Sequence, residues 1–142
     1  MPFKDEEFNL ILNRLDAFNS SEVYRILKKN GTFLTQQVGG GNLHDLIDEF
    51  NAVTNLKKWT LSSIKKDLIK VGFEVMKAQE WKGLMEFNEV GAIVYYLKAI
   101  PWVLKGFKVE KHIKYLEKLQ QKINNGEKLI YTQVRYLIIT KK

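Results

Sequence analysis

The chain contains no cysteine among its 142 residues. Disulfide bonds, thiolate zinc sites and cysteine nucleophiles are therefore excluded, and nothing in the composition argues for an oxidising compartment. The N-terminus carries acidic residues where a signal peptide carries basic residues and then an apolar stretch. No run approaches the ~18 apolar residues that a membrane span needs. The sequence predicts a soluble, cytoplasmic protein that does not contact a membrane.

Histidine is scarce, with only 2 residues in the chain. Neither His44 nor His112 has a carboxylate or a second histidine at the spacing of a metal site, so both are predicted to be surface residues. No metal site is predicted. Neither a Ser-His-Asp arrangement nor a pair of catalytic carboxylates can be argued from the spacing, so no catalytic residue is predicted.

Arginine is scarce too, although the formal net charge is +7. The cations are nearly all lysine, and the arginines are Arg14, Arg25 and Arg135. Because bidentate recognition of phosphate and guanine favours arginine, specific binding of nucleic acid is disfavoured against a lysine-rich surface. A basic module that binds an anionic partner remains an alternative function.

The apolar content, 45% of the chain, is enough for one domain with a real core. A chain of this length can bury about 70% of its surface on folding. No internal repeat, low-complexity segment or interdomain linker interrupts it, so residues 1–142 are predicted to form a single domain.

The first half alternates between strand and helix patterns. Residues 8–12 are an almost wholly apolar run, as in a strand covered on both faces. Ser20 or Ser21 can cap a helix that ends at Asn30-Gly31, and residues 32–38 return as a strand.

A glycine break at residues 39–41 opens the next segment. Asn42 is predicted to cap a helix that reaches Phe50, because apolar residues then recur at helical spacing. Thr60 is predicted to cap another helix, which stops at Gly72 and leads into a strand over residues 73–78.

The second half begins with residues 80–88, which show no clear period. An apolar helical face over residues 90–97 stops at Pro101. A long amphipathic helix follows, and residues 129–139 are a β-branched, aromatic-rich strand. The inner stripe of the long helix is predicted to consist of Ile113, Leu116, Leu119 and Ile123. Alternating strands and helices of this kind predict an α/β fold with a mainly parallel sheet and flanking helices.

The order of these segments resembles the C-terminal half of a class I S-adenosylmethionine-dependent methyltransferase. The similarity starts with Pro2-Phe3, an acidic spacer at residues 4–7 and the apolar run at 8–14, and continues through the helix at 20–31 and the strand at 32–39. It implies a truncated Rossmann-like methyltransferase sheet, closed by an antiparallel pair formed by the late strands. The methyl acceptor is not predicted.

The resemblance also shows which part of the family's site the sequence lacks. In this family the first strand and its glycine-rich loop bind the methionine part of S-adenosylmethionine, and an acidic residue after the second strand binds the ribose. Neither element is found, and Gly39-Gly40-Gly41 follows a late strand without G-x-G-x-x-G spacing. S-adenosylmethionine is therefore the implied cofactor, but this chain alone is not expected to be catalytically competent.

Site residues follow from the resemblance by position. Asn13 and Arg14 end the fourth strand of the full fold and are expected to face the cofactor, while Gln36 and Gln37 end the fifth and are expected to reach the substrate side. The alternative is that Asn13 and Arg14 form a polar strand end that bonds to nearby backbone. Asp16 either orients Arg14 or lies in an exposed turn.

Aromatic residues in the second half could line a substrate pocket, since such pockets are largely apolar. Packing in the core is the alternative. These residues are Trp81, Tyr95, Tyr96, Trp102 and Phe107.

If the first three strands of such a fold are absent, residues 8–12 become an edge strand with unpaired backbone. We expect this edge to pair in a two-fold homodimer, to be covered by terminal helices, or to dock onto the missing N-terminal half on a separate chain. Three functions therefore compete: a methyltransferase portion, a non-catalytic interaction or structural domain, and the basic module.

Overall fold

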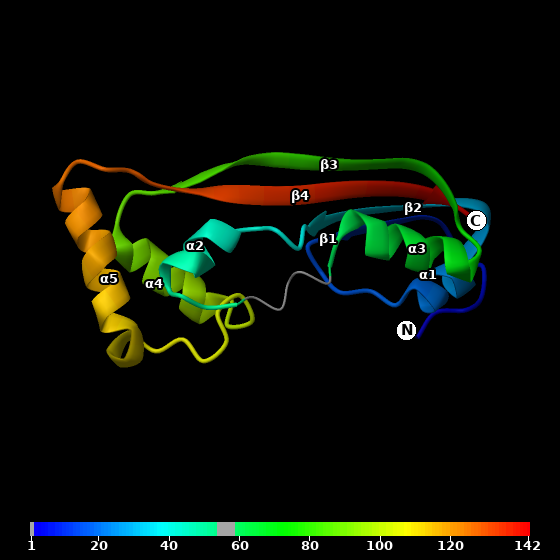
Figure 1. Cartoon of the computed structure of the whole chain (residues 1–142). Helices are drawn as coiled ribbons and strands as arrows, with labels where there is room; N and C mark the ends of the chain where they lie inside the picture. The colour runs from blue at the N-terminus through cyan, green and yellow to red at the C-terminus, as the bar shows by residue number, and fades with distance from the viewer. Residues whose placement is uncertain (1, 54–58) are drawn as a thin grey trace. The chain divides into compact units, whose positions relative to one another are not determined.

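The computed structural model describes residues 2–53 and 59–142. Strands and helices alternate as an α/β fold, with a single sheet in the described part of the chain (Figure 1). In chain order the elements are β1 (Phe8–Arg14), α1 (Ser20–Ile26), β2 (Leu27–Val38), α2 (His44–Glu49), α3 (Leu61–Val71), β3 (Glu74–Phe87), α4 (Val90–Ala99), α5 (Val109–Asn124) and β4 (Leu129–Lys141). No helix within these described ranges is both long and apolar enough to cross a membrane.

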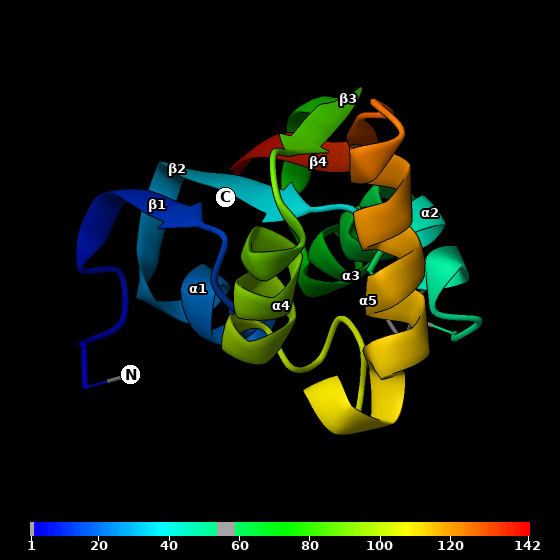
Figure 2. The same cartoon turned by 90° about the vertical axis from the view of Figure 1, so that its left-hand side faces the viewer.

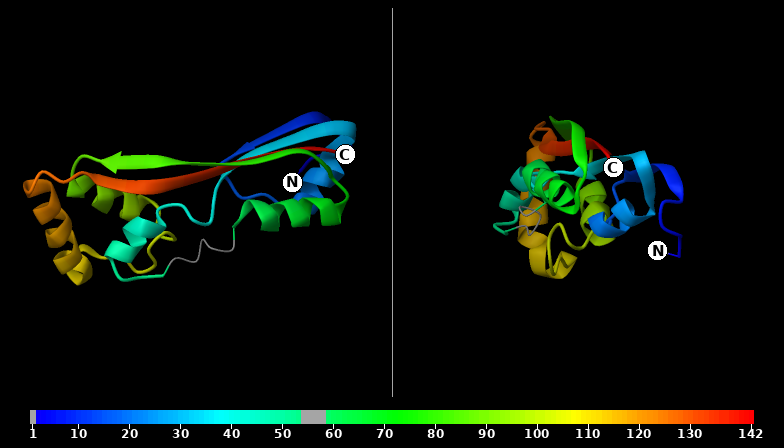
Figure 3. Two further views of the ribbon diagram at one scale, coloured as in Figure 1. Left: turned by 45° about the horizontal axis from the view of Figure 1, so that its top comes forward. Right: turned by 90° about the vertical axis from the view of Figure 1, so that its right-hand side faces the viewer.

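The sheet has the strand order β1-β2-β4-β3. β1 and β2 are parallel, whereas β2 and β4 are antiparallel. In Figure 3 the arrowhead of β3 lies where β4 begins, so these neighbours also run in opposite directions. The prediction of a mainly parallel sheet was wrong, because β4 inserts between β2 and β3. The late antiparallel pair that the resemblance implies is confirmed.

The chain divides into two compact units. Unit 1 consists of Met1–Gly40, Lys58–Trp81 and Val134–Lys142, and unit 2 consists of Gly41–Lys57 and Lys82–Gln133. β3 and β4 therefore contribute to both units. Unit 1 contains β1, α1, β2 and α3, and unit 2 contains the remaining helices.

In unit 1, α1 and α3 cover the same face of the sheet (Figure 1). Val23 of α1 and Leu68 of α3 share a buried cluster with Phe33 of β2 and Ile138 of β4. We call this covered side the inner face. Because side chains alternate along a strand, the residues between these positions point to the opposite side, which we call the outer face. By register the outer face carries Leu10, Leu12, Arg14, Thr32, Leu34, Gln36, Val38, Arg135, Leu137, Ile139 and Lys141.

α1 is shorter than predicted. Asn19, rather than either serine, caps it by accepting a hydrogen bond from the amide of Glu22. β2 already begins at Leu27, and Asn30-Gly31 lies inside this strand instead of ending the helix. Asn30 has a φ of 65°. Leu27 pairs with Phe8 and Thr32 with Leu10, so residues 28–31 of β2 are extra residues opposite β1. The left-handed signal was therefore a bulge and not a helix stop.

The signals of α3 were identified correctly. Thr60 and Ser63 form a capping box at its N-terminus, and Gly72, with a φ of 116°, ends it. The amide of Gly72 donates to the carbonyl of Ile69. Both ends are set by local chemistry, which explains why the sequence shows them.

Unit 2 packs α2, α4 and α5 around its own buried cluster, and Figure 2 shows α4 beside α5. Leu46 and Leu97 are fully buried there, as is Leu119. Asn42 does not cap α2 as predicted. The N-cap is Leu43, which adopts a left-handed conformation with a φ of 53° and makes no side-chain cap.

Two other expectations for the second half were wrong. The strand predicted over residues 73–78 is too short, because β3 continues through the aperiodic residues to Phe87 as an edge strand whose side chains are mostly exposed. On α5 the inner stripe includes His112, which is 8% exposed, in place of Ile113, which is 44% exposed. Leu116 and Leu119 are buried as predicted.

Candidate functional site

Polar side chains gather at the carboxyl ends of β1 and β2, the parallel pair of unit 1. The register places Asn13 opposite Thr35 and Arg14 opposite Gln36. The structure therefore brings together the residues that the sequence assigned to this edge. In open α/β sheets, ligands bind at the carboxyl ends of parallel strands.

On the inner face, Asn13 is the centre of a hydrogen-bonded network. Its side-chain oxygen accepts from the hydroxyl of Thr35 at 2.9 Å and from the amide nitrogen of Gln37. The same Gln37 nitrogen donates to the carbonyl of Asp16 at 2.8 Å. Thr35 is fully buried, so these bonds fix the rotamers of both amides.

On the outer face, Arg14 and Gln36 form a second pair. Nε of Arg14 donates to Oε1 of Gln36 at 3.2 Å, and the backbone amide of Leu15 donates to the Gln36 carbonyl at 2.9 Å. Both side chains of this pair are exposed in that contact. A guanidinium at an exposed strand end is suited to an anionic group.

Both hydrogen-bonded pairs join a residue that the sequence assigned to the cofactor with one that it assigned to the substrate. Asn13 was assigned to the cofactor and Gln37 to the substrate, yet they bond to each other, and Arg14 bonds to Gln36. Register decides this pairing, because alternate residues of a strand lie on opposite faces. For Asp16 the structure favours the exposed turn: the residue is exposed in a bend after β1, and its carboxylate accepts from the amide of Ala17 at 2.8 Å.

Thr35 is the member of this network that the sequence analysis missed. It lies two residues before Gln37 and so shares its face of β2. The signal was present, since a threonine inside an apolar strand needs a hydrogen-bond partner.

Gly39 has a packing role after β2. A Cβ atom there would lie 2.4 Å from Cγ1 of Val134, and the Gly39 amide donates to the Val134 carbonyl at 3.0 Å. Close backbone approach to β4 therefore explains this glycine. The structure thus favours the strand-to-helix turn over a cofactor loop at residues 39–41.

The aromatic residues divide between exposed and core positions. Tyr96 packs edge-to-face on Phe87, with ring centroids 5.8 Å apart, and Phe107 packs against the unit 2 cluster. Core packing, the alternative, describes these two residues. Tyr95 is 76% and Trp102 is 63% exposed, whereas Trp81 belongs to unit 1 and is 52% exposed. A substrate role for Trp81, Tyr95 and Tyr96 stays a prediction.

The two histidines differ from each other. His44 is exposed, as predicted, and its Nδ1 lies 2.9 Å from the Gly41 carbonyl. His112 was expected at the surface, but it is buried, stacks on Phe107 at 5.3 Å and hydrogen-bonds to the Lys108 carbonyl. Across residues 2–53 and 59–142, no group of three or more histidine or acidic side chains could hold a metal ion.

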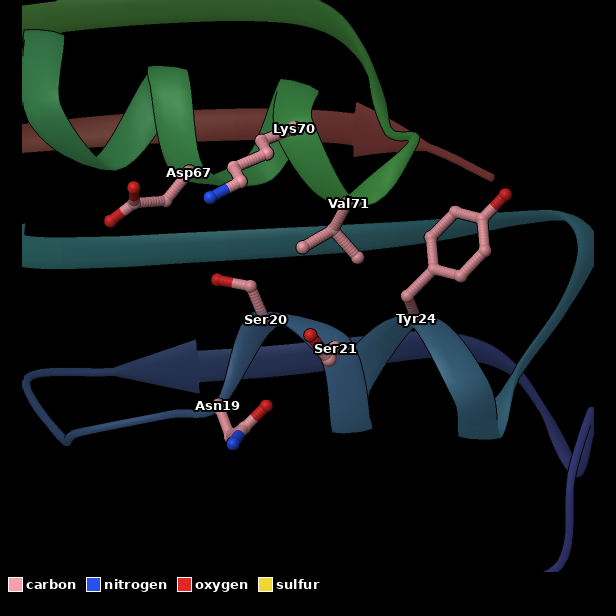
Figure 4. Close-up of a pocket in the computed structure, with 7 residues that line it drawn as sticks. All are labelled: Asn19, Ser20, Ser21, Tyr24, Asp67, Lys70 and Val71. Carbon is pink, nitrogen blue, oxygen red and sulfur yellow. The ribbon is translucent and has the colours of Figure 1, made fainter.

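A polar pocket lies between α1 and α3 in unit 1 (Figure 4). Its volume is about 690 Å³. The residues that line it are Asn19, Ser20, Ser21, Tyr24, Asp67, Lys70 and Val71. None of them was predicted as a site residue, since they belong to helices that are far apart in the sequence.

The edge of β1 is the remaining feature of the site. β1 is the first strand in the sheet order, so one side of its backbone is not paired within the described chain (Figure 3). Leu10 is 55% and Leu12 is 66% exposed. The expected edge position is confirmed, whereas burial of this strand on both faces was wrong.

Comparison with known proteins gives a likeness in structure alone. No family model and no curated protein matches the sequence. A candidate methyltransferase of Bacillus halodurans has a TM-score of 0.66 and 18% identity, over 100% of this chain and 67% of its own. The YcgJ protein of Bacillus subtilis has a TM-score of 0.58 and 18% identity, with the same two coverages.

These similarities cover all of this chain and about two thirds of each of those proteins. The resemblance that the sequence indicated is therefore confirmed at the level of fold. In its fold, this chain corresponds to part of a methyltransferase-like α/β domain.

Proposed function

We propose that this chain forms the C-terminal part of an S-adenosylmethionine-dependent methyltransferase site and is not catalytically competent alone. One observation carries the proposal. The parallel strands β1 and β2 have polar side chains at their carboxyl ends, and the outer backbone edge of β1 is unpaired in the described chain. The partial coverage of the candidate methyltransferase supports it.

Within this site we assign Asn13 and Arg14 to the cofactor and Gln36 and Gln37 to the substrate side. The carboxylate of S-adenosylmethionine is an anion, for which the guanidinium of Arg14 is suited. The amides of Asn13 and Gln37 are held in place by Thr35, and such preorganisation lowers the entropic cost of binding.

These residues fit one wall of a cofactor site and not the whole site. The described segment after β1 is Leu15-Asp16-Ala17-Phe18, which contains no glycine, and Gly39 is occupied by its contact with Val134. We therefore derive no reaction step from this chain. A partner chain is proposed to supply the glycine-rich part by pairing with β1 over residues 8–12, and a homodimer through the same edge is the other arrangement.

A non-catalytic interaction domain is the second candidate function. The exposed side chains Leu10 and Leu12 on an edge strand favour it, because such edges pair readily with other strands. Under this function the polar strand ends would serve only the fold.

Titration of S-adenosylmethionine into the isolated chain tests the proposal. Calorimetry should show no saturable binding tighter than about 100 μM. Two-dimensional NMR at millimolar cofactor should nevertheless shift the side-chain amides of Asn13, Gln36 and Gln37, because NMR detects weak binding.

Arg14→Ala should remove these shifts, whereas the control Lys118→Ala, on α5 in unit 2, should leave them unchanged. Absence of shifts in the wild-type chain would favour the interaction domain. Tight binding with normal stoichiometry would show that the chain is competent to bind cofactor alone, against the proposal.

A further inference from the structure

We infer that the side-chain oxygen of Gln37 accepts a hydrogen bond from an N–H or O–H group of the methyl acceptor, while the side-chain nitrogen of Asn13 donates to the ligand. This inference deepens the proposed function and rests on it, since Gln37 is assigned there to the substrate side. It concerns which atoms of the site donate and which accept. The class of substrate that it specifies is an amine, an amide or a hydroxyl compound.

The backbone carbonyl of Asp16 fixes the orientation of the Gln37 amide. A carbonyl oxygen can only accept, so the atom of Gln37 that lies 2.8 Å from it must be the nitrogen. An exchange of nitrogen and oxygen in this amide would place two acceptors against each other. Oε1 of Gln37 is therefore the atom of the amide that remains for a ligand.

The same reasoning orients Asn13. Oδ1 of Asn13 accepts from Nε2 of Gln37 and, at 2.9 Å, from the hydroxyl of Thr35. Because this hydroxyl has one proton, its oxygen serves as the acceptor for Nε2 of Gln37 at 3.0 Å. Thr35 is fully buried, so water does not compete for its bonds. Nδ2 is therefore the atom of Asn13 that remains for a ligand.

Both remaining atoms are open to solvent. Within residues 2–53 and 59–142, neither Nδ2 of Asn13 nor Oε1 of Gln37 has a hydrogen-bond partner. The two side chains are half-buried, and neither of these atoms is closed off from solvent. The inner face of the strand ends thus presents one donor group and one acceptor atom, both on side chains held in place by other bonds.

Arg14 and Gln36 add only donors to this edge. Arg14 has no acceptor atom, and its Nε donates to Oε1 of Gln36, which leaves the nitrogen of that amide unused. The carboxylate of Asp16 lies in the bend after β1 and already accepts from the Ala17 amide. Among the four strand-end side chains assigned to the site, Oε1 of Gln37 is therefore the acceptor left without a bond in the described chain.

This polarity separates classes of methyl acceptor. An amine, an amide or a hydroxyl group can donate to Gln37, whereas a thioether or a neutral tertiary amine has no proton to donate. A ligand of the second kind would remove water from the Gln37 oxygen without replacing its hydrogen bond. Sites that bond a substrate in this way reject analogues that lack the bonding group.

Two small probes that differ by one N–H group test the polarity on the whole chain. N-methylacetamide carries a donor and an acceptor, whereas N,N-dimethylacetamide carries the acceptor alone. In carbon-detected NMR, N-methylacetamide should shift the side-chain carbonyl carbon of Gln37, and N,N-dimethylacetamide should leave it in place. Both probes should shift the side-chain amide protons of Asn13, because both can accept from them.

Gln120 on α5 is the matched control. Its Nε2 donates to Oδ1 of Asn124 at 3.0 Å in an exposed contact, so its oxygen is likewise the atom that remains. Its carbonyl carbon reports non-specific contact with the probes and should shift less than that of Gln37.

Variants of Thr35 test its part as a positioning residue. T35V should reduce the response of Asn13 and Gln37 to N-methylacetamide, because both amides lose a buried partner. T35S retains the hydroxyl and should retain both responses. Circular dichroism verifies that each variant is folded.

Two acidic variants test the polarity without a probe. N13D keeps an oxygen for Thr35 and Gln37, whereas Q37E loses its donor and places an oxygen beside the Asp16 carbonyl. In urea denaturation the midpoint of Q37E should therefore fall below that of N13D. Q120E, at an exposed position, is the control and should unfold with the wild type.

Equal shifts of Gln37 by the two probes would overturn the inference, as would a Gln37 response no larger than that of Gln120. A lower urea midpoint for N13D than for Q37E would overturn it as well, because the amides would then be oriented the other way. These experiments contain no S-adenosylmethionine. Their failure is therefore distinguishable from failure of the cofactor titration.

Discussion

Units 1 and 2 differ in how they use their polar and apolar surface. Unit 2 uses its buried and half-buried groups internally: Asp45 accepts from the amide and hydroxyl of Thr132, and Lys122 pairs with Glu49. Unit 1 instead presents an unpaired strand edge, an uncovered apolar sheet face and polar strand ends. The parallel strand ends and the open β1 edge, where the proposal places the partner, therefore belong to unit 1.

The largest expected effect tests whether the inner and outer faces of unit 1 really differ. Phe33→Ala should lower the free energy of unfolding by about 3–5 kcal/mol, because it creates a cavity in a closed core. Phe33 is fully buried and Leu12 is 66% exposed. Leu12→Ala should therefore change stability by less than about 0.5 kcal/mol. Urea denaturation measures both, and a large loss for Leu12→Ala would show that the isolated chain covers its outer face.

The next effect concerns the internal bonding of unit 2. Asp45→Ala should cost about 2–3 kcal/mol, because it leaves the amide and hydroxyl of Thr132 without their acceptor. The carboxylate oxygen lies 2.8 Å from each of these groups. Asp48→Ala, at an exposed position of α2, is the control and should be near neutral in the same urea denaturation. Equal losses of stability for Asp45→Ala and Asp48→Ala would show that the hydrogen bonds of Asp45 to Thr132 add no stability beyond that of an acidic residue in α2.

Gly39→Ala separates packing from ligand binding in unit 1. It should destabilise the chain by about 1–3 kcal/mol, because the added methyl group clashes with Val134. V134A should restore part of that loss in the double variant. Gly91→Ala in α4 of unit 2 has no contact closer than 3.6 Å and should be neutral or stabilising. Thermal unfolding distinguishes these outcomes, and a harmless Gly39→Ala would contradict the packing role.

A smaller effect is expected at the start of α3. Thr60→Ala should cost about 1 kcal/mol, because it removes the acceptor for the Ser63 amide at 3.1 Å. Ser62→Ala, which is exposed in the first turn, is the control. If both variants unfold at the same urea concentration as the wild type, the capping box does not limit the stability of unit 1.

The smallest effect appears only at alkaline pH and involves one buried tyrosine in each unit. Burial raises the pKa of Tyr136 to about 12, and burial beside Glu49 and Asp45 raises the pKa of Tyr131 further. The unfolded tyrosines release their protons first, near the ordinary value of 10.0. Stability is therefore retained below that pH and falls as the pH rises toward the folded pKa. Urea denaturation at several alkaline pH values should show a shallower loss for Tyr136→Phe than for the wild type.

Local signals explain what the sequence could predict of the fold. The cap at Thr60 and the stop at Gly72 depend on side chains within one turn, and both were identified correctly. The direction of β4 depends on its pairing with β2, about which local chemistry says nothing. Asn30-Gly31 carried a true left-handed signal, but a helix stop and a strand bulge share that signal in sequence.

Exposure explains the other errors. The predicted β3 was too short because an edge strand exposed to solvent on both faces need not alternate apolar and polar residues. Its residues from Gln79 to Lys82 are all exposed. His112 was misplaced because its partners, Phe50 and Phe107, come from outside its own helix. In the site, position along the strands was predictable, whereas the pairing of Asn13 with Gln37 needed the register.

The position of β4 between β2 and β3 has a consequence for the timing of folding. β4 is synthesised after β2 and β3, yet it is the neighbour that both of them require. Phe33 pairs with Thr140, so the closing contacts join segments that are distant in the chain. Non-local pairings of this kind slow folding, because a long loop must close first. On the ribosome, β2 and β3 must therefore wait with open edges until β4 emerges, which makes this interval the period of greatest exposure to aggregation.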